Sequence, residues 1–148
     1  MVIILDYVVV NGKKIKTSIV SVSGPLGRVK DTYSKLIITR SKVKNLTDIE
    51  DIKGLSELIH LKELWLTRNS IEEIKGLSQL INLETLYMGF NKIGKVSRLE
   101  DLVNLKHLSL DFNNLEKIEN LDNLSILKHL NLSNNRIQKI EGLKIYQN

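Results

Sequence analysis

The chain of 148 residues contains one unit that recurs at a fixed interval. Asn69, Asn91, Asn113 and Asn135 are each 22 positions apart, and leucine or isoleucine occupies the same offsets around each of them, except for Met88 and Val96 in the second unit. The first complete unit begins at Leu58 and reads L-x-x-L-x-x-L-x-L-x-x-N-x-I-x-x-I-x-x-L. A period between about 20 and 50 residues indicates one supersecondary unit stacked on copies of itself. We therefore predict a solenoid, in which each unit packs only against its neighbours.

Each unit contains two hydrophobic periods. The Leu64-Trp65-Leu66 step has the period of a β-strand, which predicts that both leucines face the core and the tryptophan faces outward. From Ile71 to Leu83 the apolar residues recur three apart, which is typical of a tight turn followed by a short α or 3₁₀ segment. The strands are expected to stack in parallel about 4.8 Å apart. The asparagine amide can donate and accept, so we expect it to hydrogen-bond to backbone groups of the turn.

The units at both ends of the repeat array are less regular. Residues 36–58 are predicted to form a long first repeat, because Leu36 precedes its equivalent, Leu64, by 28 residues instead of 22. At the other end, five residues follow Leu143. The apolar edge of the last repeat is therefore expected to be covered by these residues, to meet another chain by self-association, or to mark a truncated protein.

A hairpin signal precedes the first repeat. The β-branched runs Val2–Val10 and Ile15–Ser23 flank an Asn-Gly pair, which predicts a β-hairpin. Terminal repeats need a cover for their apolar end. We expect residues 1–35 to form this N-terminal cap and residues 36–148 to form the solenoid, with one irregular and four regular repeats, all in one domain.

The repeat pattern resembles the 22-residue class of leucine-rich repeat proteins, typified by the nuclear leucine-rich regulatory subunit of protein phosphatase 1. The resemblance is carried by segments such as Ile71–Leu77 and Ile137–Leu143, which read IEEIKGL and IQKIEGL. It implies an α/β repeat, a right-handed solenoid with a concave parallel β-sheet and short α or 3₁₀ segments on the convex side. Axonemal dynein light chains, spliceosomal leucine-rich proteins and bacterial internalins contain similar units, so the resemblance implies no particular partner.

The outward positions of the predicted strands contain most of the aromatic residues of the repeats. Trp65 and Tyr87 share one position in successive units, and Phe90 and Phe112 share another. Solvent-facing aromatic residues on a sheet have the composition of an interaction hot spot. The alternative for the phenylalanines is that they pack into the loop edge as part of the core. We predict a non-catalytic protein-interaction module, in a phosphatase-regulatory or scaffold role, with these partner-binding residues: Trp65, Arg68, Tyr87, Phe90, His107, Asp111, Phe112 and His129.

Catalytic and metal-binding signatures are weak in this sequence. His107 and His129 share one position in successive units, but a metal site needs a third ligand converging on the same point. Polar surface is therefore the favoured interpretation, and no cofactor or metal is expected. The sequence contains no cysteine, no Gly-rich phosphate loop and no H-E-x-x-H motif, so an enzyme is not predicted.

The net charge of +5 is concentrated before the regular repeats. Residues 11–44 contain nine basic side chains and one acidic one, whereas twelve basic and eleven acidic side chains follow from residue 59 onward. One interpretation is that the lysines protect an edge strand of the cap, which the scarcity of aromatic residues there favours. The alternative is association with RNA or ribonucleoprotein through Lys13, Lys14, Lys16, Arg28 and Lys30.

The sequence also suggests where the protein resides. The first residues, MVIILDYVVV, lack the basic start of a signal peptide and include Asp6. No apolar run approaches the roughly 20 residues that span a bilayer, so no membrane association is expected. Because disulfides are typical of secreted repeat proteins and this chain has no cysteine, we expect an intracellular protein of the cytoplasm or nucleus.

Overall fold

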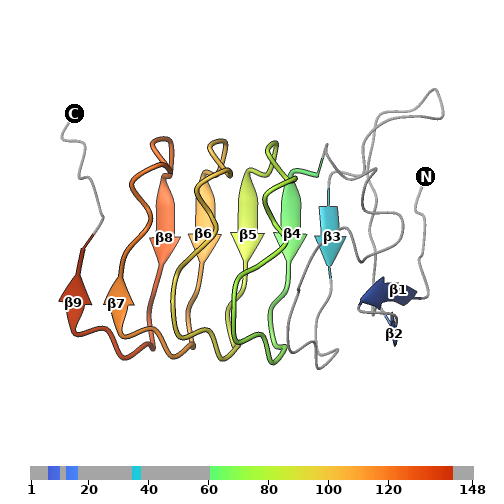
Figure 1. Cartoon of the computed structure of the whole chain (residues 1–148), viewed down its shortest axis with the longest axis horizontal. Helices are drawn as coiled ribbons and strands as arrows, with labels where there is room; N and C mark the ends of the chain where they lie inside the picture. The colour runs from blue at the N-terminus through green and yellow to red at the C-terminus, as the bar shows by residue number, and fades with distance from the viewer. Residues whose placement is uncertain (1–6, 11–12, 17–34, 38–60, 142–148) are drawn as a thin grey trace.

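A computed structural model of the chain describes residues 7–10, 13–16, 35–37 and 61–141. Figure 1 shows its main feature, a row of short strands joined by loops that return along the same path in each repeat. Five of these strands form one sheet in the order β3-β4-β5-β6-β8. Their bounds are β3 (Lys35–Ile37), β4 (Glu63–Trp65), β5 (Thr85–Tyr87), β6 (His107–Ser109) and β8 (His129–Asn131).

All strand pairs in this sheet are parallel, and the pairs from β4 to β8 have the register that a 22-residue period requires. Leu64 lies opposite Leu86, Leu86 opposite Leu108, and Leu108 opposite Leu130. Leu36 lies opposite Leu64 although 28 residues separate them. The prediction that the irregular first repeat contributes an aligned strand is therefore confirmed.

The alternation of side chains along each strand separates the core from the outer face. Leu64 and Leu66 are 2% and 0% exposed, whereas Trp65 between them is half-buried. Leucine and isoleucine from successive units form one continuous hydrophobic core over residues 61–124. Burying each such side chain contributes about 1.5–3 kcal/mol, so a one-residue shift of a strand would expose its leucine and is disfavoured. The predicted facing is confirmed for Leu64, Trp65 and Leu66, whereas Ser109, at a predicted outward position on β6, is 8% exposed.

The return segments of the described repeats are turns and short strands. Leu80 N–H donates to the carbonyl of Leu77, and Leu83 N–H donates to that of Leu80, each at 2.9 Å. A 3₁₀-helix has such i→i+3 bonds at consecutive residues, whereas here they are three residues apart. The predicted α or 3₁₀ segments are therefore wrong for these repeats: the apolar spacing of three comes from successive single turns. Nor does the described part of the chain contain a helix long and apolar enough to cross a membrane.

A second, smaller sheet accompanies the return segments of the last two described repeats. Its strands are β7 (Lys117–Ile118) and β9 (Lys139–Ile140), which pair in parallel with Ile118 opposite Ile140. In Figure 1 both strands stand at the C-terminal end of the row. This sheet could not be predicted from the sequence, because two-residue strands are too short for a recognisable hydrophobic period.

The recurring asparagine joins each repeat to the one before it. Asn113 Oδ1 accepts a hydrogen bond from the backbone N–H of Ile93 at 2.9 Å, across 20 residues of sequence. Its Nδ2 donates at 3.0–3.1 Å to the carbonyls of Met88, Leu110 and Asp111. Asn91 and Asn135 make the equivalent bonds in their own repeats. The predicted pairing of the asparagine with turn backbone is confirmed.

The predicted hairpin is present near the N-terminus. Strand β1 (Tyr7–Val10) pairs in antiparallel fashion with β2 (Lys13–Lys16), and Val10 lies opposite Lys13. Residues 2–6 and 17–23 of the two β-branched runs lie outside the described residues. Because residues 17–34 lie outside the described part, the capping role and the boundary at residue 35 stay predictions.

The candidate RNA-binding residues lie only partly within the described ranges. Lys13, Lys14 and Lys16 are on strand β2. Arg28 and Lys30 lie outside the described residues. The structure therefore does not test whether these five residues form one surface.

The core becomes less covered toward the last described repeat. Leu130 is only partly buried, as are Leu127, Leu132 and Ile137, whereas Leu108 in the preceding repeat is 2% exposed. Ile140 on β9 is 68% exposed. Residues 142–148 lie outside the described part, so the three alternatives for this edge remain open.

Candidate partner-binding face

One surface brings together six of the candidate residues. Side chains that point away from the core on β4, β5 and β6, together with those in the turns that follow each strand, lie in rows across the repeats, because equivalent residues are opposite one another in the sheet. We call this surface the aromatic face and define it by Trp65, Arg68, Tyr87, Phe90, Asp111 and Phe112.

Trp65 and Tyr87 form the first aromatic row. They are opposite one another on β4 and β5, and their ring centroids are 4.5 Å apart with an interplanar angle of 61°, an edge-to-face arrangement. The indole Nε1–H of Trp65 donates to the carboxylate of Glu63 at 3.3 Å. Both rings are half-buried, so each is held in place and still offers surface to a partner.

Phe90 and Phe112 form the second aromatic row, in the turns after β5 and β6. Their rings stack with centroids 4.1 Å apart and an interplanar angle of 11°, and they are 38% and 44% exposed. The guanidinium carbon of Arg68 lies 4.7 Å from the centroid of Phe90, which extends the stack by a cation–π contact. The alternative in which the phenylalanines pack into the core is wrong, because both rings lie on the surface.

The backbone holds this second row in an unusual conformation. Arg68, Phe90 and Phe112 have φ angles of 59°, 57° and 51°, in the left-handed region that asparagine and glycine adopt most readily. Asn134, at the equivalent position of the next repeat, has a φ of 55°. Aromatic residues in this region cost of order 1–3 kcal/mol and tend to occur at functional sites. The repeat geometry sets the conformation, and the side chains placed there are poorly suited to it.

Asp111 follows strand β6 and immediately precedes Phe112 of the second aromatic row. The hydroxyl of Ser109 donates a hydrogen bond to its Oδ1, and the carboxylate lies directly over Gly89 of the preceding repeat. A Cβ added at Gly89 would approach Asp111 Cγ to 2.9 Å, so the carboxylate can occupy this place only because residue 89 has no side chain. In the described part of the chain, no ion pair joins Asp111 to a basic residue.

The two histidines lie on the same sheet face, one row away from Trp65 and Tyr87. His107 and His129 are opposite one another on β6 and β8, and their rings stack with centroids 4.8 Å apart and an interplanar angle of 7°. Over the residues that the structure describes, no three histidine, cysteine or acidic side chains are close enough to hold a metal ion. The pair extends the polar border of the aromatic face.

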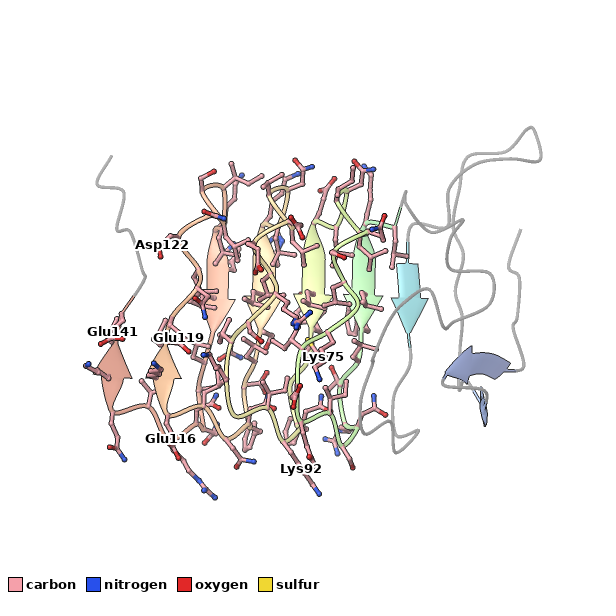
Figure 2. The ribbon with its side chains drawn as sticks, in the orientation of Figure 1. Lys75, Lys92, Glu116, Glu119, Asp122 and Glu141 are labelled. Atoms are coloured by element: carbon pink, nitrogen blue, oxygen red, sulfur yellow. The ribbon has the colours of Figure 1, made fainter. Side chains whose placement is uncertain are left out.

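Two carboxylates outside the aromatic face, those of Glu84 and Glu119, each lie between two lysines. Neither was predicted from the sequence. Glu84 lies 3.2 Å from Lys62 and 2.7 Å from Lys106 at the start of the strands. Lys62, Glu84 and Lys106 are 22 residues apart, so the same repeat period would have revealed them. On the return side, Glu119 contacts Lys117 at 2.6 Å and Lys95 at 3.2 Å, and Figure 2 shows it beside β7.

The ion pairs between Glu84 and its two lysines are expected to make a contribution to stability that depends on pH. The hydrogen bond from Lys106, followed by that from Lys62, lowers the pKa of Glu84 below its ordinary value of 4.5. A carboxylate whose folded-state pKa is lowered stabilises the fold above its unfolded pKa and loses this contribution as the pH falls through the folded value. We expect Glu84→Gln to lower the melting temperature at pH 7, by an amount worth less than about 1 kcal/mol.

The difference from the unaltered protein should disappear when melting is measured at a pH below the lowered folded-state pKa of Glu84. Glu72→Gln is the matched control, because Glu72 is exposed and forms no ion pair within residues 61–141. It should leave the melting temperature unchanged at both pH values. An effect of Glu84→Gln that persists at low pH would exclude the ion pairs as its cause.

Comparison with known proteins identifies the repeats. The family profile described as Leucine Rich repeats (2 copies) matches residues 59–103 and 81–123, and the profile described as Leucine Rich Repeat matches residues 127–145. Among solved structures, an internalin (inlF) from Listeria monocytogenes strain 4b F2365 is 27% identical, with a TM-score of 0.52. The match covers 65% of this chain and 32% of that one, so the chain spans about a third of the internalin's length. The search of curated proteins found no match.

Proposed function

Because this chain belongs to the leucine-rich repeat proteins, we propose that it is a non-catalytic module that binds a protein partner through the aromatic face. Leucine-rich repeats generally mediate protein interactions, which supports this assignment. The observation that carries it is the pair of aromatic rows on one surface: Trp65 against Tyr87 and the exposed stack of Phe90 on Phe112.

The mechanism follows from how these rings are held. Tryptophan, tyrosine and arginine dominate binding energy at protein interfaces when a partner buries them. Immobilising a flexible side chain on binding costs about 0.5–1.5 kcal/mol, and this cost is reduced here because each ring already packs on another. The strands beneath are fixed by the asparagine bonds and the leucine core. The partner therefore meets a preformed surface, with Arg68 and Asp111 setting its orientation.

The finer role in this proposal is regulatory or scaffolding, with a phosphatase catalytic subunit as one type of partner. Its support is the resemblance of segments such as Ile71–Leu77 to the phosphatase-regulatory class of repeats. The same segments resemble repeats with other partners. Identification of the captured protein is accordingly part of the test.

The test compares capture of cellular proteins by the unaltered chain and by Trp65→Ala combined with Tyr87→Ala. The double substitution removes both anchors of the first row without touching the core, so we expect captured partners to fall at least about tenfold, as loss of two hot-spot residues predicts. Quantitative mass spectrometry after affinity capture from native lysate measures this change. Circular dichroism should show nearly the same melting curve for both proteins.

The matched control removes exposed apolar residues from the return segments. Val103 and Ile126 are 50% and 42% exposed and lie outside the aromatic face. Val103→Ala combined with Ile126→Ala should leave capture unchanged. Partners retained by the Trp65/Tyr87 variant, or lost equally in the control, would contradict the proposed site.

A further inference from the structure

On the premise of the proposed function, we infer that Asp111 and the Phe90–Phe112 stack together receive an arginine side chain of the protein partner. The inference specifies the chemistry of the contact at the centre of the aromatic face. It is based on an unneutralised carboxylate, on the rings that flank it, and on an arginine–phenylalanine contact that the chain already makes.

The carboxylate of Asp111 lacks the partners that comparable groups have. Glu84 and Glu119 each lie between two lysines. Asp111 is half-buried, and its hydrogen bond within the described residues comes from the neutral hydroxyl of Ser109. A partly desolvated carboxylate without a counter-charge is complementary to a cation, because charge-assisted hydrogen bonds are about twice as strong as neutral ones.

The position of this carboxylate is determined before any partner arrives. It lies over Gly89, where a Cβ would come within 2.9 Å of its Cγ, and Ser109 holds one of its oxygens. The other oxygen, Oδ2, accepts no hydrogen bond from the described residues. A cation can therefore bind without first moving the acid, which is the preorganisation that a recognition site requires.

The neighbouring rings favour guanidinium over ammonium. Asp111 immediately precedes Phe112 in the chain, and Gly89, over which its carboxylate lies, immediately precedes Phe90. Guanidinium is planar and weakly hydrated, so it can lie against a ring while its N–H groups bond to a carboxylate, whereas a lysine ammonium is a compact, strongly hydrated charge.

The chain contains an example of the same contact. Arg68 lies over Phe90, with its guanidinium carbon 4.7 Å from the ring centroid. The stack then continues to Phe112 and ends there, because the next residue in the row is Asn134. An arginine from the partner would place a second guanidinium against the same rings, beside the Asp111 carboxylate, with which no basic residue of the described repeats forms an ion pair.

The experiment uses two blocked peptides, Gly-Arg-Gly and Gly-Lys-Gly, titrated into the ¹⁵N-labelled full chain at constant ionic strength. For the arginine peptide we expect saturable shifts of the amide resonances of Gly89, Asp111 and Phe112. Asp111→Asn should weaken its binding about tenfold, and the lysine peptide should bind the unaltered chain several-fold more weakly. Asp122→Asn, which removes a carboxylate from a return segment, is the control and should leave binding unchanged.

A second variant separates local geometry from net charge. Gly89→Ala keeps every charge but displaces the Asp111 carboxylate, so we expect it to weaken the arginine peptide to a similar extent. Equal binding of the two peptides, no binding of the arginine peptide, or unchanged binding in Asp111→Asn would each overturn the inference. The proposed function is tested independently of this contact. If the Trp65/Tyr87 variant loses its partners while Asp111→Asn retains them, the result supports the aromatic face as the binding site and contradicts the arginine contact.

Discussion

Replacing Asn113 by leucine is expected to destabilise the fold by about 2–4 kcal/mol, although the two side chains have similar volumes. Asn113 is 6% exposed and bonds to four backbone groups from two repeats. Leucine can replace none of these bonds. An unsatisfied buried polar group costs about 1–3 kcal/mol.

The substitution would leave mainly one backbone group without a hydrogen-bond partner. The carbonyls of Met88 and Leu110 keep a second donor, from Asn91 and Asn135 respectively. The N–H of Ile93 has Asn113 as its acceptor, and no other acceptor for it lies in the described repeats. The backbone at Ile93 would therefore lose its side-chain connection to the next repeat. Urea unfolding monitored by circular dichroism measures the change in free energy.

The control for this prediction is Asn123→Leu. Asn123 is exposed on a return segment, and surface substitutions of this kind change stability by no more than about 0.5 kcal/mol. If Asn113→Leu were as mild as Asn123→Leu, the asparagine bonds could not be what joins the repeats.

Strand positions and facing could be predicted because they follow from spacing alone. In parallel strands with a 22-residue period, equivalent residues must lie opposite one another, so Trp65 and Tyr87 share a row once Leu64 and Leu86 face the core. The return segments could not be predicted in the same way. Apolar residues three apart suit both a 3₁₀-helix and successive turns, and only the backbone hydrogen bonds distinguish the two.

The sequence predicted which residues belong to the candidate site, but it could not predict how their side chains are arranged. The repeat places Phe90 and Phe112 in one row, yet their exposure depends on a left-handed backbone that turns each ring away from the core. The residue types do not indicate this left-handed conformation, because arginine and phenylalanine occupy a position better suited to asparagine. The approach of Asp111 to Gly89 also depends on side-chain orientation, which a sequence pattern does not specify.

Position along the solenoid should determine the cost of removing equivalent core leucines. From the repeat pattern alone, Leu108→Ala and Leu130→Ala are expected to cost the same, about 2–5 kcal/mol. The structure separates them, because Leu108 is 2% exposed between two described repeats whereas Leu130 is only partly buried on β8 at the end of the sheet. We therefore expect about 2–5 kcal/mol for Leu108→Ala and about 2 kcal/mol or less for Leu130→Ala.

Urea unfolding of both variants measures this difference, with Thr85→Ala as an outward-facing control that should change stability by about 0.5 kcal/mol or less. The physical reason is that an interior leucine packs against a repeat on each side, so its removal leaves a cavity that neither side can close. At the end of the described array, the same truncation removes contacts mainly on one side and leaves a site that solvent can enter. Equal losses for Leu108→Ala and Leu130→Ala would mean that another surface covers Leu130 in solution, which is the behaviour expected if the last repeat meets a second chain.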